Sequence, residues 1–302
     1  HPLHTKSLLI TTDSQKLPTG INRVDGDLSS TISGNGRGSQ VNADIAIIDT
    51  GIQLNHPDLN VYRQKTFVAG TSAAKDNSIG AVGIAPGARL WAIKVLDKNG
   101  AGSVSDVIAG IDYATAHAKE IDVVNMSFGC ECKSSALDSA ITKSVSKGIT
   151  YVVAAGNSKK DASTFTPASN PKVISVSAIS DTDGKCGSKG PTSNYGKDDS
   201  FATFSNYGST VDISAPGVGI YSTFKGSSYK TLSGTSMSAA HVSGAVALYK
   251  ANVNPSALPD EIMNALRSVG SNLQSVCDGN GFGYFTNDAD KFPEPLLYVR
   301  KF

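Results

Sequence analysis

Short apolar segments alternate along this chain with segments that have helical periodicity. Strands are expected at 44–48, 89–95, 122–127, 150–154, 173–178 and 211–214, and helices at 103–118, 137–147, 236–251 and 259–268. Compact apolar runs are typical of strands that are buried on both faces, and such strands form parallel sheets with helical crossovers. The alternation therefore predicts an α/β fold, with a doubly wound, mainly parallel sheet flanked by helices.

The length of the chain suits one large domain or two small ones, because 302 residues can bury a sizeable core. Residues 1–14 are polar and irregular, which predicts an N-terminal arm. Residues 15–302 show no internal repeat and no linker, so we expect a single domain there. Gly, Ser, Lys and Asn are concentrated at 184–199, which predicts a surface insertion in this domain.

Charge and hydropathy argue against several classes of partner. The chain has 27 Lys and Arg against 26 Asp and Glu, so we expect neither nucleic acid nor an anionic membrane surface as a partner. No apolar run approaches the roughly 18 residues of a membrane helix. Charged residues make up only 18%, and Ser, Thr and Gly are abundant, which predicts a secreted protein and, we expect, a monomer. The chain begins His-Pro-Leu-His without a signal-peptide pattern, so we expect a mature or trimmed form.

The four cysteines are Cys130, Cys132, Cys186 and Cys277. One residue separates Cys130 from Cys132, a spacing that we expect to be too tight for a bridge between them. The pair also lacks the matching His or Cys residues of a zinc site. We expect two disulfides that link the first two cysteines to the last two, with free thiols or a single bridge as the alternatives.

Three polar residues stand at the ends of predicted strands or at the start of a predicted helix. Ser236 begins a helix of small residues, where the dipole and the backbone N–H groups can support a reactive hydroxyl and hold an oxyanion. Asp49 ends a buried strand, where a carboxylate can orient an imidazole. Asn157 follows another strand, where its amide can donate to an oxyanion. Taken singly, each has a plainer interpretation: a helix cap, an Asx turn and a closing turn.

The order of these residues is more specific than any one of them. The chain contains, in this order, Ile-Ala-Ile-Ile-Asp49-Thr-Gly-Ile, Asn-His56-Pro-Asp58-Leu, Ala-Ala-Gly-Asn157 and Gly-Thr-Ser236-Met. This series resembles the subtilisin-like serine proteases of the subtilase superfamily, over residues 15 to 275. The resemblance implies a three-layer subtilisin-like catalytic domain, with Ser236 as nucleophile, Asp49 as the carboxylate that orients a histidine, and Asn157 as oxyanion donor. Phe-Thr-Pro-Ala-Ser at 165–169 and the cysteines favour the proteinase K side of the family.

The same resemblance implies a groove that holds an extended peptide by backbone hydrogen bonds, with a pocket for the residue before the scissile bond. The groove segments are Gly100-Ala101-Gly102 and Ser127-Phe128-Gly129. The pocket residues are Phe128, the stretch from Ala154 to Gly156 and the stretch from Phe165 to Ser169. For Phe128, a plain core aromatic is the alternative. The implied partners are a peptide or protein substrate and, in addition, the chain's own propeptide or a protein inhibitor.

The catalytic histidine of the family is absent. It lies in Gly-His-Gly-Thr-His-Val-Ala-Gly-Thr, whereas this chain reads Thr-Phe-Val-Ala-Gly-Thr at 66–71. The end of the motif survives, both histidines are missing, and the connection is roughly 15 to 20 residues short in a region where a long functional loop is expected. One deletion that joins Thr66-Phe67-Val68 to Ala69-Gly70 accounts for these differences.

No other base stands where the triad requires one. The histidines of the chain are His1, His4, His56, His117 and His241. The first four lie in the arm, in the turn before the gap or after a surface helix. His241 lies five residues after Ser236 on the same helix, so it is rotated away from it. Lys65 is a conceivable base, but a neighbouring Asp49 would raise the pKa of that lysine, which disfavours the role.

Residues 73–81, Ala-Ala-Lys-Asp-Asn-Ser-Ile-Gly-Ala, interrupt a helix with a glycine-containing loop. This loop resembles the strong calcium site of the family. The resemblance implies as ligands the side chains of Gln15, Asp58 and Asn77 and the carbonyls of Lys75, Ile79 and Ala81. An all-oxygen set suits a hard cation, so we expect structural Ca²⁺. An Asx-rich turn without an ion is the alternative.

The sequence therefore predicts a subtilisin-like endopeptidase scaffold that binds extended peptides and acts through an acyl-enzyme on Ser236. Its activity is expected to be strongly impaired because the histidine is absent. Two alternatives remain: a non-catalytic protein that binds peptides or an inhibitor, and an active protease whose histidine-bearing segment is omitted from this sequence.

Overall fold

The computed structural model of the chain describes residues 14–38, 40–51, 53, 55–61 and 68–302. The strands are β1 (Asp44–Asp49), β2 (Arg89–Lys94), β3 (Val123–Met126), β4 (Thr150–Ala154), β5 (Ile174–Ser180), β6 (Ser200–Phe201), β7 (Ile213–Pro216), β8 (Ile220–Phe224) and β9 (Ser228–Leu232). The α-helices are α1 (Thr19–Arg23), α2 (Val68–Ala73), α3 (Val104–Ala116), α4 (Ser135–Val145), α5 (Thr235–Asn252) and α6 (Pro259–Val269), and the 3-10 helices are η1 (Gly26–Leu28) and η2 (Ala162–Thr164). Each strand and helix expected from the sequence is present, with its ends shifted by at most a few residues.

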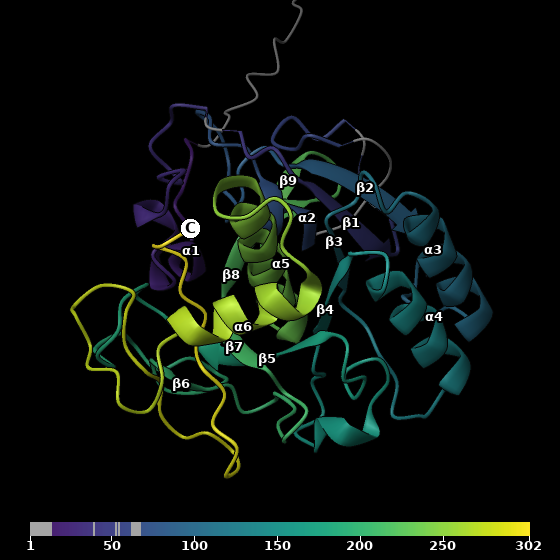
Figure 1. Ribbon diagram of the computed structural model, residues 1–302. Coiled ribbons are helices and arrows are strands. Elements are labelled where there is room, and N and C mark those ends of the chain that lie inside the picture. The colour runs from purple at the N-terminus through teal and green to yellow at the C-terminus, as the bar shows by residue number, and fades with distance from the viewer. Residues whose placement is uncertain (1–13, 39, 52, 54, 62–67) are drawn as a thin grey trace, which may run out of the picture.

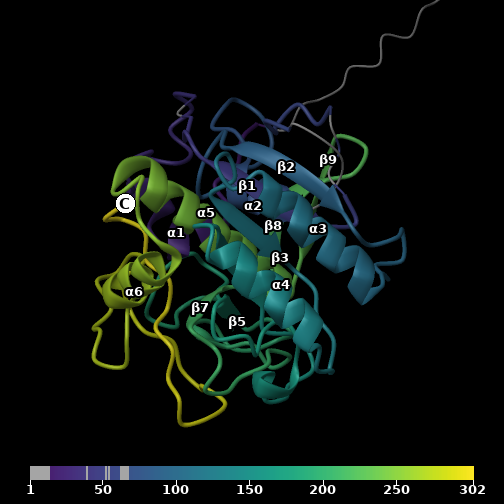
Figure 2. The ribbon, with the colours of Figure 1, turned by 45° about the vertical axis from the view of Figure 1, so that its right-hand side comes forward.

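The large sheet is parallel except at one edge. Its strands lie in the order β2-β1-β3-β4-β5, and β5 then pairs with β7 in parallel and with β6 antiparallel. Helices α3 and α4 cover one face of the sheet, and α2, α5 and α6 lie on the other, as Figures 1 and 2 show from two directions. The chain therefore has the expected doubly wound, mainly parallel α/β fold.

Successive side chains of the central strands belong to opposite layers. In β1, Ile45 and Ile47 pack in the cluster that contains α5, whereas Ala46 and Ile48 pack in the cluster that contains α3 and α4. All four side chains are fully buried. Because both faces of the sheet are covered, the strands can be apolar at every position, as their sequences are.

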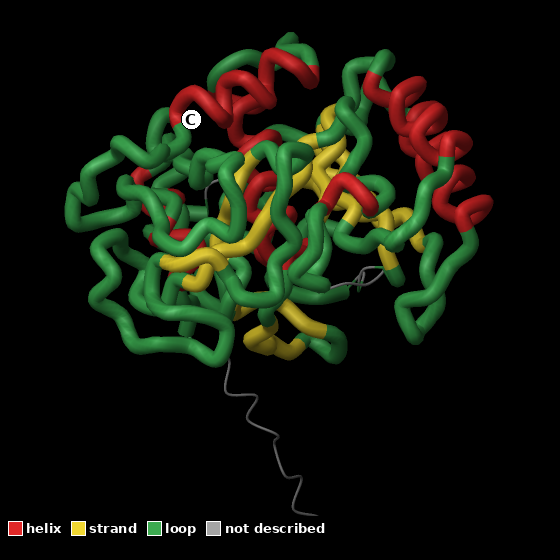
Figure 3. Tube along the Cα trace, turned by 90° about the horizontal axis from the view of Figure 1, so that it is seen from below, coloured by secondary structure: helices red, strands yellow, loops and turns green. Residues whose placement is uncertain are grey.

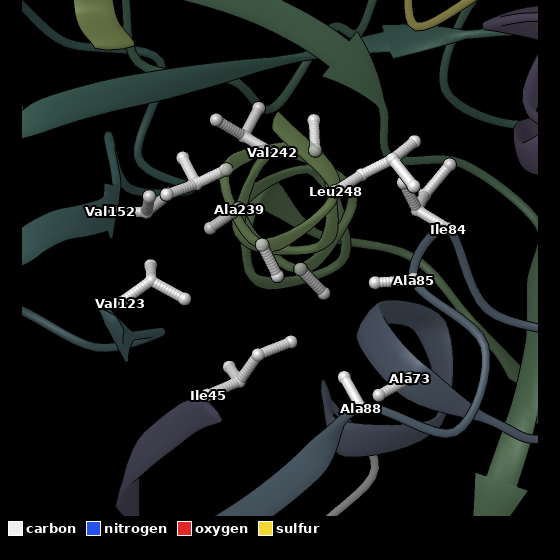
Figure 4. Packing of buried hydrophobic residues seen from close by; sticks show 14 of the residues in the cluster. Ile45, Ala73, Ile84, Ala85, Ala88, Val123, Val152, Ala239, Val242 and Leu248 are labelled. Atoms are coloured by element: carbon white, nitrogen blue, oxygen red, sulfur yellow. The ribbon is translucent and has the colours of Figure 1, made fainter. Parts of the chain in front are cut away.

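Helix α5 is buried nearly all round, with 13 of its 18 residues buried. Figure 4 shows side chains of the sheet, such as Val123 and Val152, on one side of this helix and Ala85 on the other. Small residues allow this close approach: a Cβ on Gly244 would lie 2.6 Å from the Cβ of Ile84. A helix without a polar face depends on its surroundings for stability, so α5 and the sheet form together.

The antiparallel hairpin of β8 and β9 was not predicted from the sequence. Exposed and half-buried residues alternate irregularly in β9, so neither strand shows a clear period of two. Helix α2 packs so closely against β8 that a Cβ on Gly70 would lie 2.3 Å from Oγ1 of Thr223. Contact with α2 therefore helps to hold a hairpin that its own pattern specifies weakly.

The cysteine pairing expected from the sequence is wrong. Cys130 is bonded to Cys132, and Cys186 to Cys277. The backbone brings the Cα atoms of the first pair to 5.3 Å, which lies within the range of disulfides. Two backbone hydrogen bonds between Cys130 and Thr166 hold this bend in place. The second bridge joins the 184–199 segment to the C-terminal part of the chain.

Three segments that are distant in sequence meet at the buried guanidinium of Arg23. Its Nε donates to Asp199 at 2.7 Å, and its Nη1 and Nη2 donate to the carbonyls of Gly281 and Gly283. Residues 271–302 form neither helix nor strand, and Figure 3 shows how much of this side of the molecule is loop. Arg23 thus ties α1 to the 184–199 segment and to the C-terminal loops.

Among the described residues, no helix is both long and apolar enough to cross a bilayer.

Glu294 is buried where the C-terminal loops cross the sheet. Its carboxylate accepts hydrogen bonds from Oγ of Ser177 in β5 and Oγ of Ser214 in β7. Burial raises the pKa of Glu294 from 4.5 to about 7. Folding therefore favours the protonated carboxyl group.

We expect ionisation of Glu294 to destabilise the fold. Because the folded pKa is raised, the stabilising contribution is complete below pH 4.5 and is lost as the pH rises through about 7. Between pH 4.5 and pH 8, the free energy of unfolding of the parent should fall relative to that of Glu294→Gln by about 3 kcal/mol. Urea unfolding at the two pH values measures this difference. Glu120→Gln, at an exposed carboxylate, should follow the parent, and a difference independent of pH would contradict the prediction.

Candidate active site

Ser236 lies in the first turn of α5, at the edge of the sheet where the parallel strands end. Its Oγ donates a hydrogen bond of 2.9 Å to the carbonyl of Ser127, which follows β3. The N-cap of the helix is Gly234, whose φ of 154° lies in the region that favours glycine. In the first turn the N–H of Thr235 donates to Asn157 and that of Met237 donates to the carbonyl of Gly234, so the N–H of Ser236 is the one placed to bind an anion next to this hydroxyl.

Asn157 follows β4 and is oriented by the residue before Ser236. Its Oδ1 accepts hydrogen bonds from N and Oγ1 of Thr235, both at 2.9 Å. Since the carbonyl side of the amide is occupied, the Nδ2 side is left to donate. Nδ2 lies 3.5 Å from the position that a Cβ on Gly234 would take, so the donor lies beside the turn that carries the serine.

Asp49 ends β1, at the same edge of the sheet. Burial raises the pKa of this carboxyl, hydrogen bonds from Thr50 lower it, and the charge of Lys94 lowers it further. The Lys94 ammonium itself donates to the carbonyls of Thr50 and Leu96. Asp49 is therefore a half-buried carboxylate in the expected place, and no described histidine is recorded as its hydrogen-bond partner.

Each described histidine is engaged away from Ser236. His56 bonds through Nε2 to the carbonyl of Ser228, and His117 caps α3 through the carbonyl of Tyr113. His241 donates from Nδ1 to the carbonyl of Met237, and burial lowers its pKa to about 4. His1, His4, Lys65 and the expected junction at Thr66-Phe67 lie outside the described residues.

A cavity of about 320 Å³ opens beside Ser236. It is lined by Ser127, Phe128, Gly129, Ala154, Ala155, Gly156, Asn157, Ser158, Phe165, Thr166, Ala168, Thr235 and Ser236. Eleven residues proposed for catalysis or for the groove and pocket are thus brought together. Ser158 and Thr235 were not singled out, although each adjoins a predicted site residue in sequence.

The other groove segment, Gly100-Ala101-Gly102, lies in the loop between β2 and α3 and does not line this cavity. All three residues are exposed. Asp97 shapes the loop, because its backbone N–H donates to the carbonyl of Ala101 and its Oδ1 accepts from the N–H of Ala101. The assignment of this segment to peptide binding stays a prediction.

The six residues expected to bind calcium lie in one small cluster. Nε2 of Gln15 donates to the carbonyl of Lys75 at 2.8 Å and approaches that of Ala81 at 3.5 Å. Asn77 donates to Oδ1 of Asp58, and the N–H of Ala81 donates to Oδ2. The remaining residue, Ile79, donates its N–H to Asn77 and forms a β-bridge with Ser14.

The oxygen atoms of this cluster are ligands that suit a hard cation. Two carbonyl oxygens converge on the end of the Gln15 side chain, and Asp58 supplies a fully buried carboxylate. Burial raises the pKa of Asp58 to about 7, against hydrogen bonds that lower it. A buried carboxyl group that ionises with difficulty is one that a bound cation would stabilise as the anion.

A second group of acidic residues was not singled out in the sequence. One carboxylate oxygen each of Asp181, Asp183 and Asp198 lies within 4.8 Å of the others. Burial raises the pKa of Asp181 to about 8, and the neighbouring Arg23 opposes the rise. Asp181 and Asp198 also accept backbone hydrogen bonds from Gly184 and Gly190 within the same loop region, so they shape the 184–199 segment.

Known proteins resemble this chain in sequence and in fold. Residues 66–284 match the subtilase family. The alkaline protease of Alkalihalobacillus alcalophilus is 36% identical over 283 residues, which cover 88% of this chain and 68% of the relative. The chain belongs to the subtilase family. Another relative, Subtilisin NAT of Bacillus subtilis subsp. natto, is 38% identical over 263 residues, 80% of this chain and 63% of the relative. A crystal structure described as a cold adapted subtilisin-like serine proteinase superposes with a TM-score of 0.71 at 28% identity, covering 93% of this chain and 97% of that one.

Membership of the subtilase family confirms the resemblance on which the site was predicted. The subtilisin-like scaffold is shown by both the family match and the structural neighbour. Asn157 and Ser236 lie inside the matched range, and Asp49 lies before it. The roles of individual residues within this subtilase remain proposals.

The wall of the cavity requires a glycine at position 156, and we expect Gly156→Ala to destabilise the fold there. Its φ is 113°, and a Cβ would lie 2.4 Å from Nδ2 of Asn206. Asn206 is fully buried and bonds the carbonyl of Ala155 and the N–H groups of Ser158 and Lys160. The variant should lose about 2–3 kcal/mol in urea unfolding.

Gly148→Ala is the matched control, because Gly148 has a φ of 93° but no heavy atom within 4 Å of the added Cβ. It should lose only the cost of a positive φ, about 1 kcal/mol. Equal losses in the two variants would show that the contact with Asn206 does not matter.

Proposed function

We propose that this subtilase binds extended peptides beside Ser236 and cleaves them only slowly. The observation that carries the proposal is the convergence of Ser236, Asn157 and the 320 Å³ cavity at one edge of the sheet, where no described histidine contacts the serine. A nucleophile, an oxyanion donor and a substrate pocket support acyl transfer. The sequence lacks the histidine that would accept the proton of the serine, so we expect the transfer to be slow.

The chemistry proposed for the site is that of an impaired acyl-enzyme. A peptide carbonyl placed against Ser236 would have its developing negative charge stabilised by the amide of Asn157 and the backbone N–H of Ser236. Asp49 would have no imidazole to orient. Loss of the triad histidine costs on the order of 10⁶ in turnover, and binding with oxyanion stabilisation can leave roughly 10³-fold over water. We therefore expect peptide binding with residual cleavage.

Labelling by a fluorophosphonate tests this balance. We expect the parent to react at Ser236 at least 10³-fold more slowly, by order of magnitude, than a subtilisin of the family that retains its histidine. Mass spectrometry follows the labelling, and Ser236→Ala should not react. Rapid stoichiometric labelling would refute the impaired activity. The intact mass of the same sample, against 31.2 kDa for this sequence, then shows whether a histidine-bearing segment is present.

The finer assignments belong to the same proposal. We expect peptide or protein substrates, and a propeptide or a protein inhibitor as further partners, to lie along Ser127-Phe128-Gly129 and Gly100-Ala101-Gly102 as added strands. Secretion as a monomer is proposed as well, and the two disulfides support the secretion. We also place the chain toward the proteinase K side of the family, on the segment at 165–169 and the cysteines.

We further propose that Gln15, Asp58, Asn77 and the carbonyls of Lys75, Ile79 and Ala81 hold a structural Ca²⁺. The oxygen donors and the buried carboxylate of Asp58 support this assignment. The ion would supply positive charge that links residues near the N-terminus to the loop after α2. It would take no part in the reaction at Ser236.

Removal of calcium should lower the melting temperature of the parent by several degrees, because the ion binds the folded chain alone. Differential scanning fluorimetry with excess chelator and with 5 mM Ca²⁺ added, on the order of what saturates such sites, measures the shift. Asp58→Asn should abolish the shift, and Asp260→Asn, at an exposed carboxylate, should retain it. An undiminished shift in Asp58→Asn would place the ion elsewhere.

A further inference from the structure

The stretch of chain around the nucleophile has a charge that the overall composition hides. The whole chain is nearly balanced, with 27 basic and 26 acidic residues. Residues 213–259, from β7 to the start of α6, contain no Asp or Glu at all. The charged residues of this stretch are Lys225, Lys230 and Lys250, so its hairpin and its helix carry positive charge only.

Two of these lysines are gathered on one aromatic ring in the β8–β9 hairpin. The Nζ atoms of Lys225 and Lys230 lie 5.9 and 5.1 Å from the ring centre of Phe224. Both side chains are exposed, and neither has an ion-pair partner within 4.0 Å among the residues that the structure describes. The ring holds two like charges together at the surface through cation–π contacts.

Phe224 connects these lysines to the nucleophile. It packs, with Leu232 of β9, against the cluster of Ile220 and Met237, and Met237 is the residue after Ser236. None of these hairpin residues lines the cavity beside Ser236. The hairpin therefore lies next to the serine but apart from the pocket that is assigned to the residue before the scissile bond.

The tip of the hairpin is held in place by uncharged neighbours. Oε1 of Gln53 accepts a hydrogen bond from the N–H of Gly226 at 2.6 Å, and Nε2 of Gln53 donates to Oγ of Ser227 and to Asn55. Figure 2 shows β9 near the outer edge of the molecule. A fixed, exposed and purely basic element is suited to recognise opposite charge.

We propose that the β8–β9 hairpin selects peptides with acidic side chains on the leaving-group side of the scissile bond, through Lys225 and Lys230. The inference rests on the proposed peptide-binding function of this site. A carboxylate placed there would relieve the repulsion between two ammonium groups that share one ring. Each contact is exposed, so the preference is modest and falls with ionic strength.

Fluorescence anisotropy of labelled ten-residue peptides tests the proposal, with Ser236→Ala as the host so that the peptides stay intact. One peptide carries Asp and Glu in its C-terminal half, a second carries Asn and Gln there, and a third carries the acids in its N-terminal half. At low salt we expect the first to bind about fivefold more tightly than the second, and the third to show no gain from the lysines. In 0.5 M salt the preference should nearly vanish, since the Debye length is then only about 4 Å.

The Lys225→Gln/Lys230→Gln double variant of this host should bind the first and second peptides within about twofold of each other. Lys147→Gln, at an exposed lysine after α4, is the control and should keep the preference. Equal binding of the acidic and neutral peptides by the host overturns this inference alone. Failure of every peptide to bind overturns the proposed function and this inference with it. Lysine-dependent binding that is stronger for a single-stranded oligonucleotide than for the acidic peptide also overturns it.

Discussion

The burial of helix α5 against the sheet is the contact on which the rest of the molecule depends. Its small residues let β3, β4 and β5 approach from one side and α2 and the loop at Ile84 from the other. The helix has no solvated face that could stabilise it alone. Packing therefore fixes both its direction and its height, and with them the position of Ser236 opposite the carbonyl of Ser127. A hydrophobic core thus places the hydroxyl that we propose as the nucleophile.

The sheet and its helices were accessible to sequence analysis because burial on both faces leaves a strong signal. Runs such as Ile45–Ile48 are apolar at every position, and helix starts carry caps such as Ser103, which accepts from the N–H of Asp106. The loops after α6 carry no such signal, because contacts with residues distant in sequence organise them. Buried Arg23 binds two of their carbonyls, and buried Glu294 binds serines of β5 and β7. The cysteine pairing was mispredicted for a similar reason, since it depends on a local bend at Cys130 that spacing does not reveal.

Part of the candidate site could likewise be located from the sequence, and part could not. Asn157, Ser236 and the pocket residues follow buried strands or begin a buried helix, so a motif could locate them, and the structure brings them together. The β8–β9 hairpin was missed because its residues contact α2 and Met237 rather than repeating with a period of two. The two lysines of this hairpin matter because the fold places them beside Ser236. The net charge of +1 for the whole chain does not reveal this local positive charge.

The disulfide between Cys186 and Cys277 would hold the molecule together after a single backbone cleavage. A backbone cut in the stretch from Gly187 to Ser233 would divide the chain between Asn157 and Ser236, the proposed oxyanion donor and nucleophile. Because the bridge encloses that whole stretch, both pieces would remain covalently joined, and the parallel sheet and α5 would still hold them in register. A nicked molecule of this kind would run as one species until a reducing agent separates it. The disulfide would thus keep Asn157 and Ser236 in one covalently linked molecule after such a cut.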